Sequence, residues 1–336
     1  MSLEISKPQK LLDENGKLTS CGWSGEPLLQ YDRDNIKVSR LRIQEWESYL
    51  LVNDSCALRL TIADYGTMGL VSATLLDFQR DFYHTETVKQ RMSLGRMGLP
   101  FSSIHGDATY TKKRIGMNFS KAARKRYLKC DLINFVNGKN LYVQLELEEK
   151  DRDTLVCALP FSCDPHCFHY SQKTIYSHIQ GTVRCGGEEY SFQNNAFGLL
   201  DWGRCVWPRS TSWNAACCQG TIEGKSFSFY ISDGPSDYNQ VSESAYFLDG
   251  KLYKIEGIHF SPQQNLSLWT IHSEDRRIMM TFEPAFPYIK ELRFGLGRHD
   301  SRLIFGIFSG RICTEYKTVS FGPIAGFLEN IHHQMW

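Results

Sequence analysis

Short stretches in which apolar and polar residues alternate dominate this chain. Apolar side chains occupy every second position over 58–62, over 141–147 and over 227–231, with polar or aromatic hydroxyl residues between them. A period of two predicts strands that bury one face. Helical spacing is weak until the last residues, so we expect a fold built of strands.

Glycine-containing pairs separate these stretches and mark the turns. The pairs are Asn137-Gly138, Gly186-Gly187, Glu223-Gly224 and Asp249-Gly250. Asn-Gly and Asp-Gly supply the positive φ angles that tight hairpins require. We therefore expect hairpins over 246–255 and over 267–282. Strands joined by short turns pair antiparallel, and many of them in series favour closure into a barrel.

A domain boundary is predicted where the alternation stops. The stretch 157–171 contains two prolines and divides the chain into residues 1–160 and 161–336, two parts of similar length. Each part has the size of one ligand-holding β-barrel. We therefore expect an N-terminal barrel and a C-terminal barrel.

The C-terminal residues have the spacing of an amphipathic helix. Phe327, Leu328, Ile331 and Met335 follow Gly326, and this spacing predicts one short helix packed on a barrel. On that helix Glu329 and His333 stand four residues apart, which is more typical of a surface pair than of a ligand set.

Composition excludes some partners and suggests a compartment. Lys and Arg number 38 and Asp and Glu 37, for a net charge of +1, so we expect no nucleic-acid partner. The basic run 112–129 is balanced by acidic residues at 146–153. No apolar stretch approaches the ~20 residues of a membrane span, and no signal-peptide segment is seen at the start. Eleven cysteines, an odd number, favour reduced thiols and a cytoplasmic protein.

The densest chemical motif lies over 197–213. Three of the seven tryptophans, Trp202, Trp207 and Trp213, stand around the ionisable pair Asp201 and Arg204. A carboxylate that faces an apolar cavity is a potential proton donor. The same residues also suit a structural plug in which tryptophan fills a barrel end and the Asp–Arg pair clamps a turn. Both interpretations stay open at this point.

The sequence gives little support for a metal site or a nucleotide site. Cys163, His166, Cys167 and His169 crowd together without the second ligand pair of a zinc finger, and a loop at the domain junction explains them better. Neither a phosphate-binding loop nor a Gly-x-Ser-x-Gly elbow is present. We therefore expect no cofactor and no metal.

Several ordered segments resemble a family known as domain of unknown function 2804. They are Gly22-Trp23, Arg42–Trp46, Thr61–Gly66, Asp201–Arg204, Glu243–Lys254 and Phe305–Gly310. Together they run nearly from end to end. That family looks like a distant relative of the AttH-like and carotenoid 1,2-hydratase group, which has two lipocalin-like barrels and members that protonate a double bond without a cofactor.

The resemblance implies roles for individual residues. Asp201 would be the acid, the three tryptophans would form the pocket wall, and Asp64 and Glu243 are secondary ligand-binding candidates. Arg204 is expected to hold Asp201 or an anionic substrate group.

The sequence thus predicts an all-β protein with two lipocalin-like antiparallel barrels and a short C-terminal helix. The leading function is binding of a hydrophobic small molecule of terpenoid, polyketide or acyl type, with or without cofactor-independent hydration, isomerisation or cyclisation. A non-catalytic carrier or sensor is the alternative, and a glycan-binding or glycan-processing protein is a second one.

Overall fold

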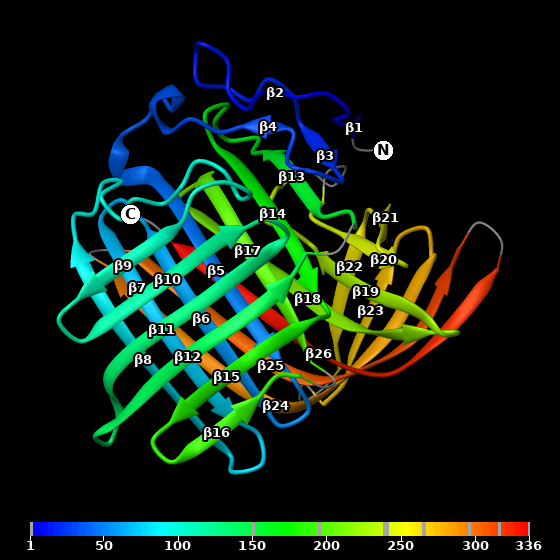
Figure 1. The fold of residues 1–336 in the computed structure, drawn as a ribbon. Coiled ribbons are helices and arrows are strands. Elements are labelled where there is room, and N and C mark those ends of the chain that lie inside the picture. Colours follow the sequence, from blue (N-terminus) through cyan, green and yellow to red (C-terminus); the bar gives the residue numbers. More distant parts are fainter. Residues whose placement is uncertain are drawn as a thin grey trace.

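A computed structural model describes residues 3–149, 152–193, 196–237, 242–263, 267–294, 297–314 and 317–334, and for 289–294 it describes the backbone alone. These residues form three large sheets (Figure 1). The small elements are a two-stranded sheet of β2 (Gln9–Lys10) and β4 (Leu29–Gln30) and the 3₁₀ turns η1 (Arg33–Asn35) and η2 (Arg40–Arg42).

Sheet 1 has nine strands and lies at the centre of the molecule. β5 and β7 are buried at every position, because other sheets cover both faces. Its strands, in spatial order, are β1 (Leu3–Glu4), β3 (Gly22–Ser24), β13 (Leu155–Pro160), β14 (Phe168–Tyr176), β17 (Phe197–Val206), β5 (Ile43–Val52), β6 (Cys56–Asp64), β7 (Met68–Asp77) and β8 (Phe82–Arg91).

Sheet 2 has six strands and covers one face of sheet 1 (Figure 1). In β12 buried and less buried positions alternate, because one face is solvated and the other packs on the core, as the pattern over 141–147 predicts. Its strands, in order, are β16 (Glu188–Ser191), β15 (Ile179–Cys185), β12 (Lys139–Glu148), β11 (Lys125–Val136), β10 (Ile115–Ala122) and β9 (Ala108–Lys112).

Sheet 3 has nine strands and packs on the other face of sheet 1. Its strands, in order, are β21 (Lys251–Lys254), β20 (Ala245–Leu248), β19 (Lys225–Ser232), β18 (Ser210–Ile222), β26 (Thr318–Gln334), β25 (Gly297–Cys313), β24 (Ile278–Phe294), β23 (Trp269–Ser273) and β22 (Ile258–Pro262). One end of the long strands β24–β26 lies against sheet 1, where Phe286 contacts Phe78 and Phe327 contacts Phe197. The other end encloses a second apolar core.

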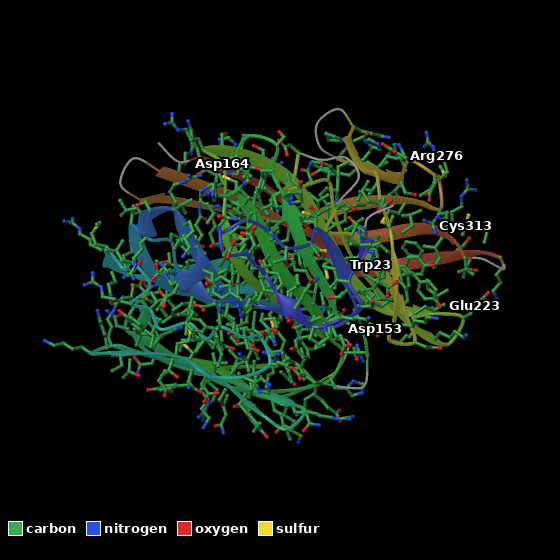
Figure 2. The ribbon with its side chains drawn as sticks, turned by 90° about the horizontal axis from the view of Figure 1, so that it is seen from above. Trp23, Asp153, Asp164, Glu223, Arg276 and Cys313 are labelled. Carbon is green, nitrogen blue, oxygen red and sulfur yellow. The ribbon has the colours of Figure 1, made fainter. Side chains whose placement is uncertain are left out.

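The view from above shows this arrangement directly (Figure 2). Sheet 2 forms one side of the molecule, and the far end of sheet 3, marked by Glu223, Arg276 and Cys313, projects away from Asp164. The prediction of an all-β fold from curled antiparallel sheets is confirmed. Both predicted hairpins form, since Ala245 pairs with Lys254 and Trp269 pairs with Phe282.

The predicted C-terminal helix is wrong. Thr318–Gln334 is a strand, β26, and Met335 lies outside the described residues. β26 pairs with β18 on one side and with β25 on the other. Backbone pairing on both edges outweighs a short helical pattern, because local propensity is weak compared with tertiary contacts.

The chain passes from sheets 1 and 2 to sheet 3 later than residue 160, where the domain boundary is predicted. Strands β14 and β17, which the predicted boundary assigns to the second barrel, pair with each other and with β5 of sheet 1. β15 and β16 complete sheet 2. The last strand of sheets 1 and 2 ends at Val206, and the first strand of sheet 3 begins at Ser210.

Two further findings concern thiols and membranes. Cys217 and Cys218 lie buried on β18 as free thiols on a strand, as predicted. In the described part of the chain no helix has both the length and the apolar character needed to cross a bilayer.

Candidate functional site

A cavity of about 80 Å³ lies between sheet 1 and sheet 3. β5, β6, β14 and β17 contribute to its wall on one side, and β18, β19, β25 and β26 on the other. Its lining residues are Trp46, Ser48, Leu50, Arg59, Thr61, Tyr65, His169, Lys173, Leu199, Asp201, Trp207, Trp213, Tyr230, Glu243, His299, Ser301, Phe327, Glu329 and Ile331. Aromatic rings and ionisable groups therefore meet in one buried space.

Asp201 lies in the middle of β17, where it pairs with Ser48 of β5 and with Lys173 of β14. Its Oδ1 accepts hydrogen bonds from Trp46 Nε1 at 2.9 Å and from Lys173 Nζ at 2.6 Å. Among the described residues Oδ2 has no hydrogen-bond partner, and the side chain is 25% exposed. One oxygen is thus fixed, and the side chain forms part of the cavity wall.

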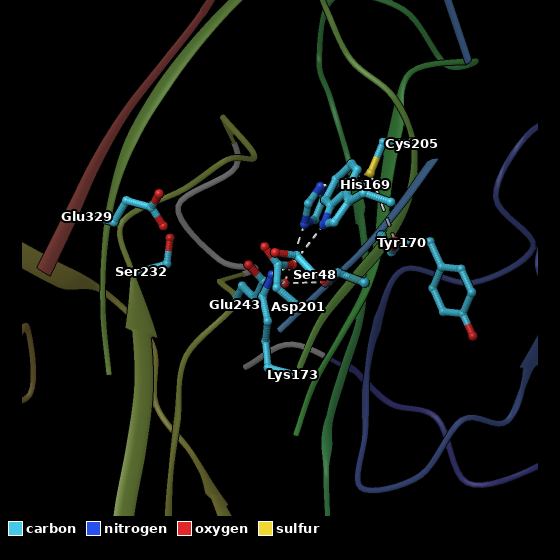
Figure 3. Close-up of polar contacts among 12 residues, drawn as sticks. Ser48, His169, Tyr170, Lys173, Asp201, Cys205, Ser232, Glu243 and Glu329 are labelled. Atoms are coloured by element: carbon cyan, nitrogen blue, oxygen red, sulfur yellow. Dashed lines mark hydrogen bonds and ion pairs between the residues drawn. The ribbon is translucent and has the colours of Figure 1, made fainter. Parts of the chain in front are cut away.

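Lys173 joins two carboxylates (Figure 3). Its Nζ lies 2.6 Å from Asp201 Oδ1 and 3.3 Å from Glu243 Oε1, so these oxygens are at most about 5.9 Å apart. Burial opposes the charged form of the lysine, but both carboxylates hold its pKa well above the usual range. Burial alone would raise the pKa of Glu243, yet Lys173 and His169 lower it to about 2.

Glu243 precedes β20 and is almost fully buried. Its Oε1 accepts hydrogen bonds from the Ser171 hydroxyl and from His169 Nε2, the latter at 3.4 Å. Because Oε1 is shared by several donors, this carboxylate orients Lys173 and His169 at the cavity wall.

The two ring nitrogens of His169 have different partners. The indole Nε1–H of Trp207, which can only donate, bonds to His169 Nδ1 at 3.0 Å. The ring proton therefore sits on Nε2, toward Glu243. Cys205 Sγ lies 3.1 Å from the same Nδ1. Although Cys205, His169 and Glu243 follow the order of a nucleophilic triad, the thiol is fully buried and burial raises its pKa well above normal, so it is a structural contact.

A second ion pair crosses the cavity at another point. Arg59 of β6 donates to Glu329 of β26 at 2.7 Å, and the hydroxyl of Ser301 donates to the same carboxylate. Glu329 and His333, expected on a helix surface, are instead buried positions of one strand. Burial lowers the pKa of His333 to about 3.

Gly203 makes room for the indole that holds Asp201. A Cβ at this position would lie 2.1 Å from Cζ2 of Trp46. Gly203 and Trp46 are direct partners in the β17–β5 ladder. Only a residue without a side chain lets the ring cross here.

Three predicted site residues lie elsewhere. Arg204 and Trp202 point to the opposite side of sheet 1, where the guanidinium lies 4.0 Å from the indole centroid and donates to the carbonyls of Trp46 and Pro100. The expected pairing of Arg204 with Asp201 is wrong, because residues three apart on a strand face opposite sides. Asp64 accepts hydrogen bonds from Ser93 and neighbouring backbone amides and fixes a turn.

The structure brings the candidates Asp201, Trp207, Trp213 and Glu243 together in the wall of one cavity. It adds Trp46, His169, Lys173, Arg59 and Glu329, which the sequence analysis did not assign to a site. A lysine in the middle of an otherwise buried strand, as at position 173, is the one local signal.

The Cys163–His169 cluster does not converge. Asp164 bonds to His166 and lies 3.6 Å from Arg42, whereas His169 points into the cavity. Within the described ranges no three His, Cys, Asp or Glu side chains are placed to hold a metal ion.

Comparison with known proteins gives a family and distant folds. The sequence model described as domain of unknown function (DUF2804) matches residues 2–336. No curated protein matches. Kievitone hydratase from Nectria haematococca is 11% identical, with 86% of this chain and 88% of that chain covered and a TM-score of 0.49.

Two further solved structures are similarly distant. CghA is 10% identical, with 98% and 97% covered and a TM-score of 0.49. A putative AttH from Nitrosomonas europaea is 9% identical, with 90% and 96% covered and a TM-score of 0.44. At this distance the names of these proteins carry no argument for this chain.

Proposed function

Because this chain belongs to the family of domain of unknown function 2804, whose description assigns no activity, we propose a function from the cavity itself. The protein binds a small organic molecule between sheet 1 and sheet 3, and Asp201 exchanges a proton with it without a cofactor. The observation that supports this proposal is the asymmetric carboxylate of a cavity-lining residue, with Oδ1 fixed by Lys173 and Trp46 and Oδ2 without a hydrogen-bond partner among the described residues.

The hydrogen bonds favour a base as the starting form. Two donors on Oδ1, one of them an ammonium group, stabilise the carboxylate. Oδ2 then accepts a proton and later returns it, so Asp201 acts first as base and then as acid. This order is the reverse of the one suggested by the family resemblance.

Two reactions satisfy this proton balance. If the proton comes from a carbon of the ligand and returns to another carbon, the double bond moves and the reaction is an isomerisation. If it comes from water whose oxygen adds to a double bond, the proton returns to the neighbouring carbon and the reaction is a hydration. In both, Lys173 and Trp46 hold Oδ1 throughout.

The cavity limits the part of the ligand that reaches Asp201. Its volume of about 80 Å³ is far below the roughly 300–1,000 Å³ of pockets that enclose a drug-sized ligand. A whole terpenoid or polyketide exceeds this space, so we propose that a small reactive group enters while the remainder lies outside it.

The glycan alternative is less well supported. The separation of at most about 5.9 Å between Asp201 and Glu243 oxygens resembles that of glycosidase carboxylates. Glu243, however, is buried and its Oε1 is already bonded to Ser171, His169 and Lys173. A nucleophile needs an oxygen that is free to attack the sugar, and Oε1 is held by these three groups.

Isotope incorporation tests the function without a known substrate. The purified protein is incubated with metabolite extracts in D₂O and in H₂¹⁸O, and products are followed by mass spectrometry. An isomerase adds deuterium when the proton held by Asp201 exchanges with solvent before it returns to the ligand, and a hydratase adds both isotopes. Asp201→Asn keeps the size of the side chain and abolishes incorporation, whereas the control Asp131→Asn, on an exposed position of β11, retains it.

Persistence of the isotope signal in Asp201→Asn would refute the assignment of Asp201. A ligand that co-purifies and binds unchanged in both variants, with no isotope entering any compound, would favour the non-catalytic carrier.

A further inference from the structure

We infer that the ligand carries a carbonyl group beside its reacting carbon atoms, and that the hydroxyl of Tyr230 donates a hydrogen bond to the carbonyl oxygen. The inference rests on the proposed role of Asp201 as a base, because it names the kind of ligand on which such a base can act. It follows from a buried hydroxyl at the cavity, from its position relative to Asp201 and from the acidity of carbon.

Tyr230 is a buried tyrosine whose hydroxyl lacks a partner in the described part of the chain. It lies on β19, where it pairs with Cys217 of β18 and Ala245 of β20. The residue is 5% exposed and lines the cavity. Among the described residues no group forms a hydrogen bond with its hydroxyl. A buried phenol normally has such a partner, so this one requires an explanation.

Other buried tyrosines of the chain follow the usual rule. The hydroxyl of Tyr49 donates to Glu47, and that of Tyr170 donates to the backbone carbonyl of Leu29. Tyr110 of β9 also has a buried hydroxyl without a partner among the described residues, but it does not belong to the described lining of the cavity. A ligand in the cavity can therefore satisfy Tyr230 but not Tyr110.

Tyr230 lies close to Asp201. Lys173 Nζ is 5.0 Å from the ring centroid of Tyr230 and 2.6 Å from Asp201 Oδ1, so this centroid and this oxygen are at most about 7.6 Å apart. The charges of Lys173, Glu243 and Asp201 all act on the pKa of the phenol, and burial raises it well above its usual range. The hydroxyl therefore keeps its proton at neutral pH and is a donor beside the proposed base.

A carboxylate base needs a ligand that spreads the negative charge it creates. A carbonyl group does this, because the electron pair moves onto its oxygen and forms an enolate. An alkene without a carbonyl offers no such atom. A preorganised hydrogen-bond donor at the developing oxyanion lowers the barrier further. The pair of Asp201 as base and Tyr230 as donor therefore suits a carbonyl compound.

Both proposed reactions balance on such a ligand. In the isomerisation Asp201 takes a proton from the carbon beside the carbonyl, an enolate conjugated with the double bond forms, and the proton returns at the far end of that double bond. In the hydration Asp201 takes a proton from water, whose oxygen bonds to the β carbon of an unsaturated carbonyl compound. The π electrons move to the carbonyl oxygen, and the proton then returns to the α carbon. Tyr230 donates to the enolate oxygen and keeps its own proton.

Hydrogen exchange of a small ketone tests the inference as a rate. Butanone is incubated in D₂O with the full chain, and proton nuclear magnetic resonance follows the loss of the hydrogens beside its carbonyl. Tyr230→Phe should slow the protein-dependent exchange by about a hundredfold, as expected for the loss of one oxyanion donor. Asp201→Asn should abolish it. The control Tyr110→Phe, which also removes a hydroxyl without a described partner, should keep the wild-type rate.

Binding without turnover gives a second measurement. Ligand-observed magnetic resonance compares butanone with 2-methylbut-1-ene, in which a CH₂ group replaces the carbonyl oxygen. Tyr230→Phe is expected to weaken butanone binding by about tenfold and to leave alkene binding within about twofold. The substitution takes no hydrogen bond from any described residue, so the variant should fold, and circular dichroism verifies this.

The outcomes separate this inference from the proposed function. Unchanged exchange and unchanged butanone binding in Tyr230→Phe would overturn the inference, as would no effect of the protein on butanone at near-molar concentration. Isotope incorporation into metabolites that depends on Asp201 would still support the proposed function in that case. Conversely, butanone binding that depends on Tyr230, with no exchange in any variant, would refute proton exchange by Asp201 and keep the carbonyl site.

Discussion

Replacement of Gly203 by alanine should destabilise the protein and disturb the site at once. The new Cβ would stand 2.1, 2.4 and 2.5 Å from Cζ2, Cε2 and Cη2 of Trp46, far inside van der Waals contact. The indole has little room to move aside, because the ring centroids of Trp46 and Trp207 are only 5.3 Å apart. It would also lose its hydrogen bond to Asp201.

Gly203→Ala is expected to lower the free energy of unfolding by about 3 kcal/mol or more. Overpacking of a core costs about 1–3 kcal/mol, and this site lies at the upper end because three ring atoms clash. For a chain of this length about 2 °C of melting temperature corresponds to 1 kcal/mol. Thermal unfolding followed by circular dichroism should therefore show a fall of about 6 °C.

Two controls make the reasoning refutable. Gly116→Ala on β10 adds a methyl group with no atom within 4 Å, so its effect should stay within about 0.5 kcal/mol. In a Trp46→Leu background the clash is removed, and Gly203→Ala should lose most of its effect in a double-mutant cycle. A change below 1 °C, or the same loss with and without Trp46, would show that the indole is not the obstacle.

Three other predictions follow from buried ionisable groups and thiols. Burial lowers the pKa of His333 from its ordinary 6.5 to about 3, so the unfolded chain takes up this proton first. Stability therefore falls as the pH drops from 6.5 to 3, by up to about 1.4 kcal/mol per pH unit, and His333→Gln should weaken the dependence of the melting temperature on pH over that range. Lys173→Met leaves Asp201 and Glu243 without their shared cation and should lower the free energy of unfolding by about 3–5 kcal/mol. Thermal unfolding measured side by side should show a larger loss for Lys173→Met than for Asp201→Asn. The opposite order would contradict the bridging role of Lys173. Of the eleven thiols, Cys163 is the exposed one, so Ellman's reagent should label it first and Cys163→Ser should remove the fast phase; an unchanged fast phase would refute this assignment.

Local patterns predicted the strands and turns because the information they need is local. The turn at Asp249-Gly250 joins β20 to β21 as its residue types require. The spacing of Phe327, Leu328 and Ile331 is that of a helix, yet the same residues are buried in a strand with partners on both sides. One of these partners, β18, lies more than a hundred residues away in sequence, so the local pattern does not contain it.

The candidate site was recognised only where one segment carries it. Asp201, Trp207 and Trp213 stand close in sequence, but Lys173 and Trp46 reach Asp201 through strand register. Strand parity also explains the error with Arg204, because an odd separation along β17 sends two side chains to opposite faces of the sheet. The pattern along a single chain does not contain the register between strands that are distant in sequence.

The cavity belongs to the junction of the two sheets and to neither sheet alone. Sheet 1 supplies Asp201 and Lys173, whereas Glu243 and Glu329 come from the part of the chain that forms sheet 3. Separation of the sheets would break the Lys173–Glu243 and Arg59–Glu329 contacts and leave charges without partners, at a cost of about 3–5 kcal/mol for each buried pair. Ligand access by movement of whole sheets is therefore unfavourable. Movement of side chains at the cavity edge, where Asp201 and Arg59 retain some exposure, is the route that keeps both ion pairs intact.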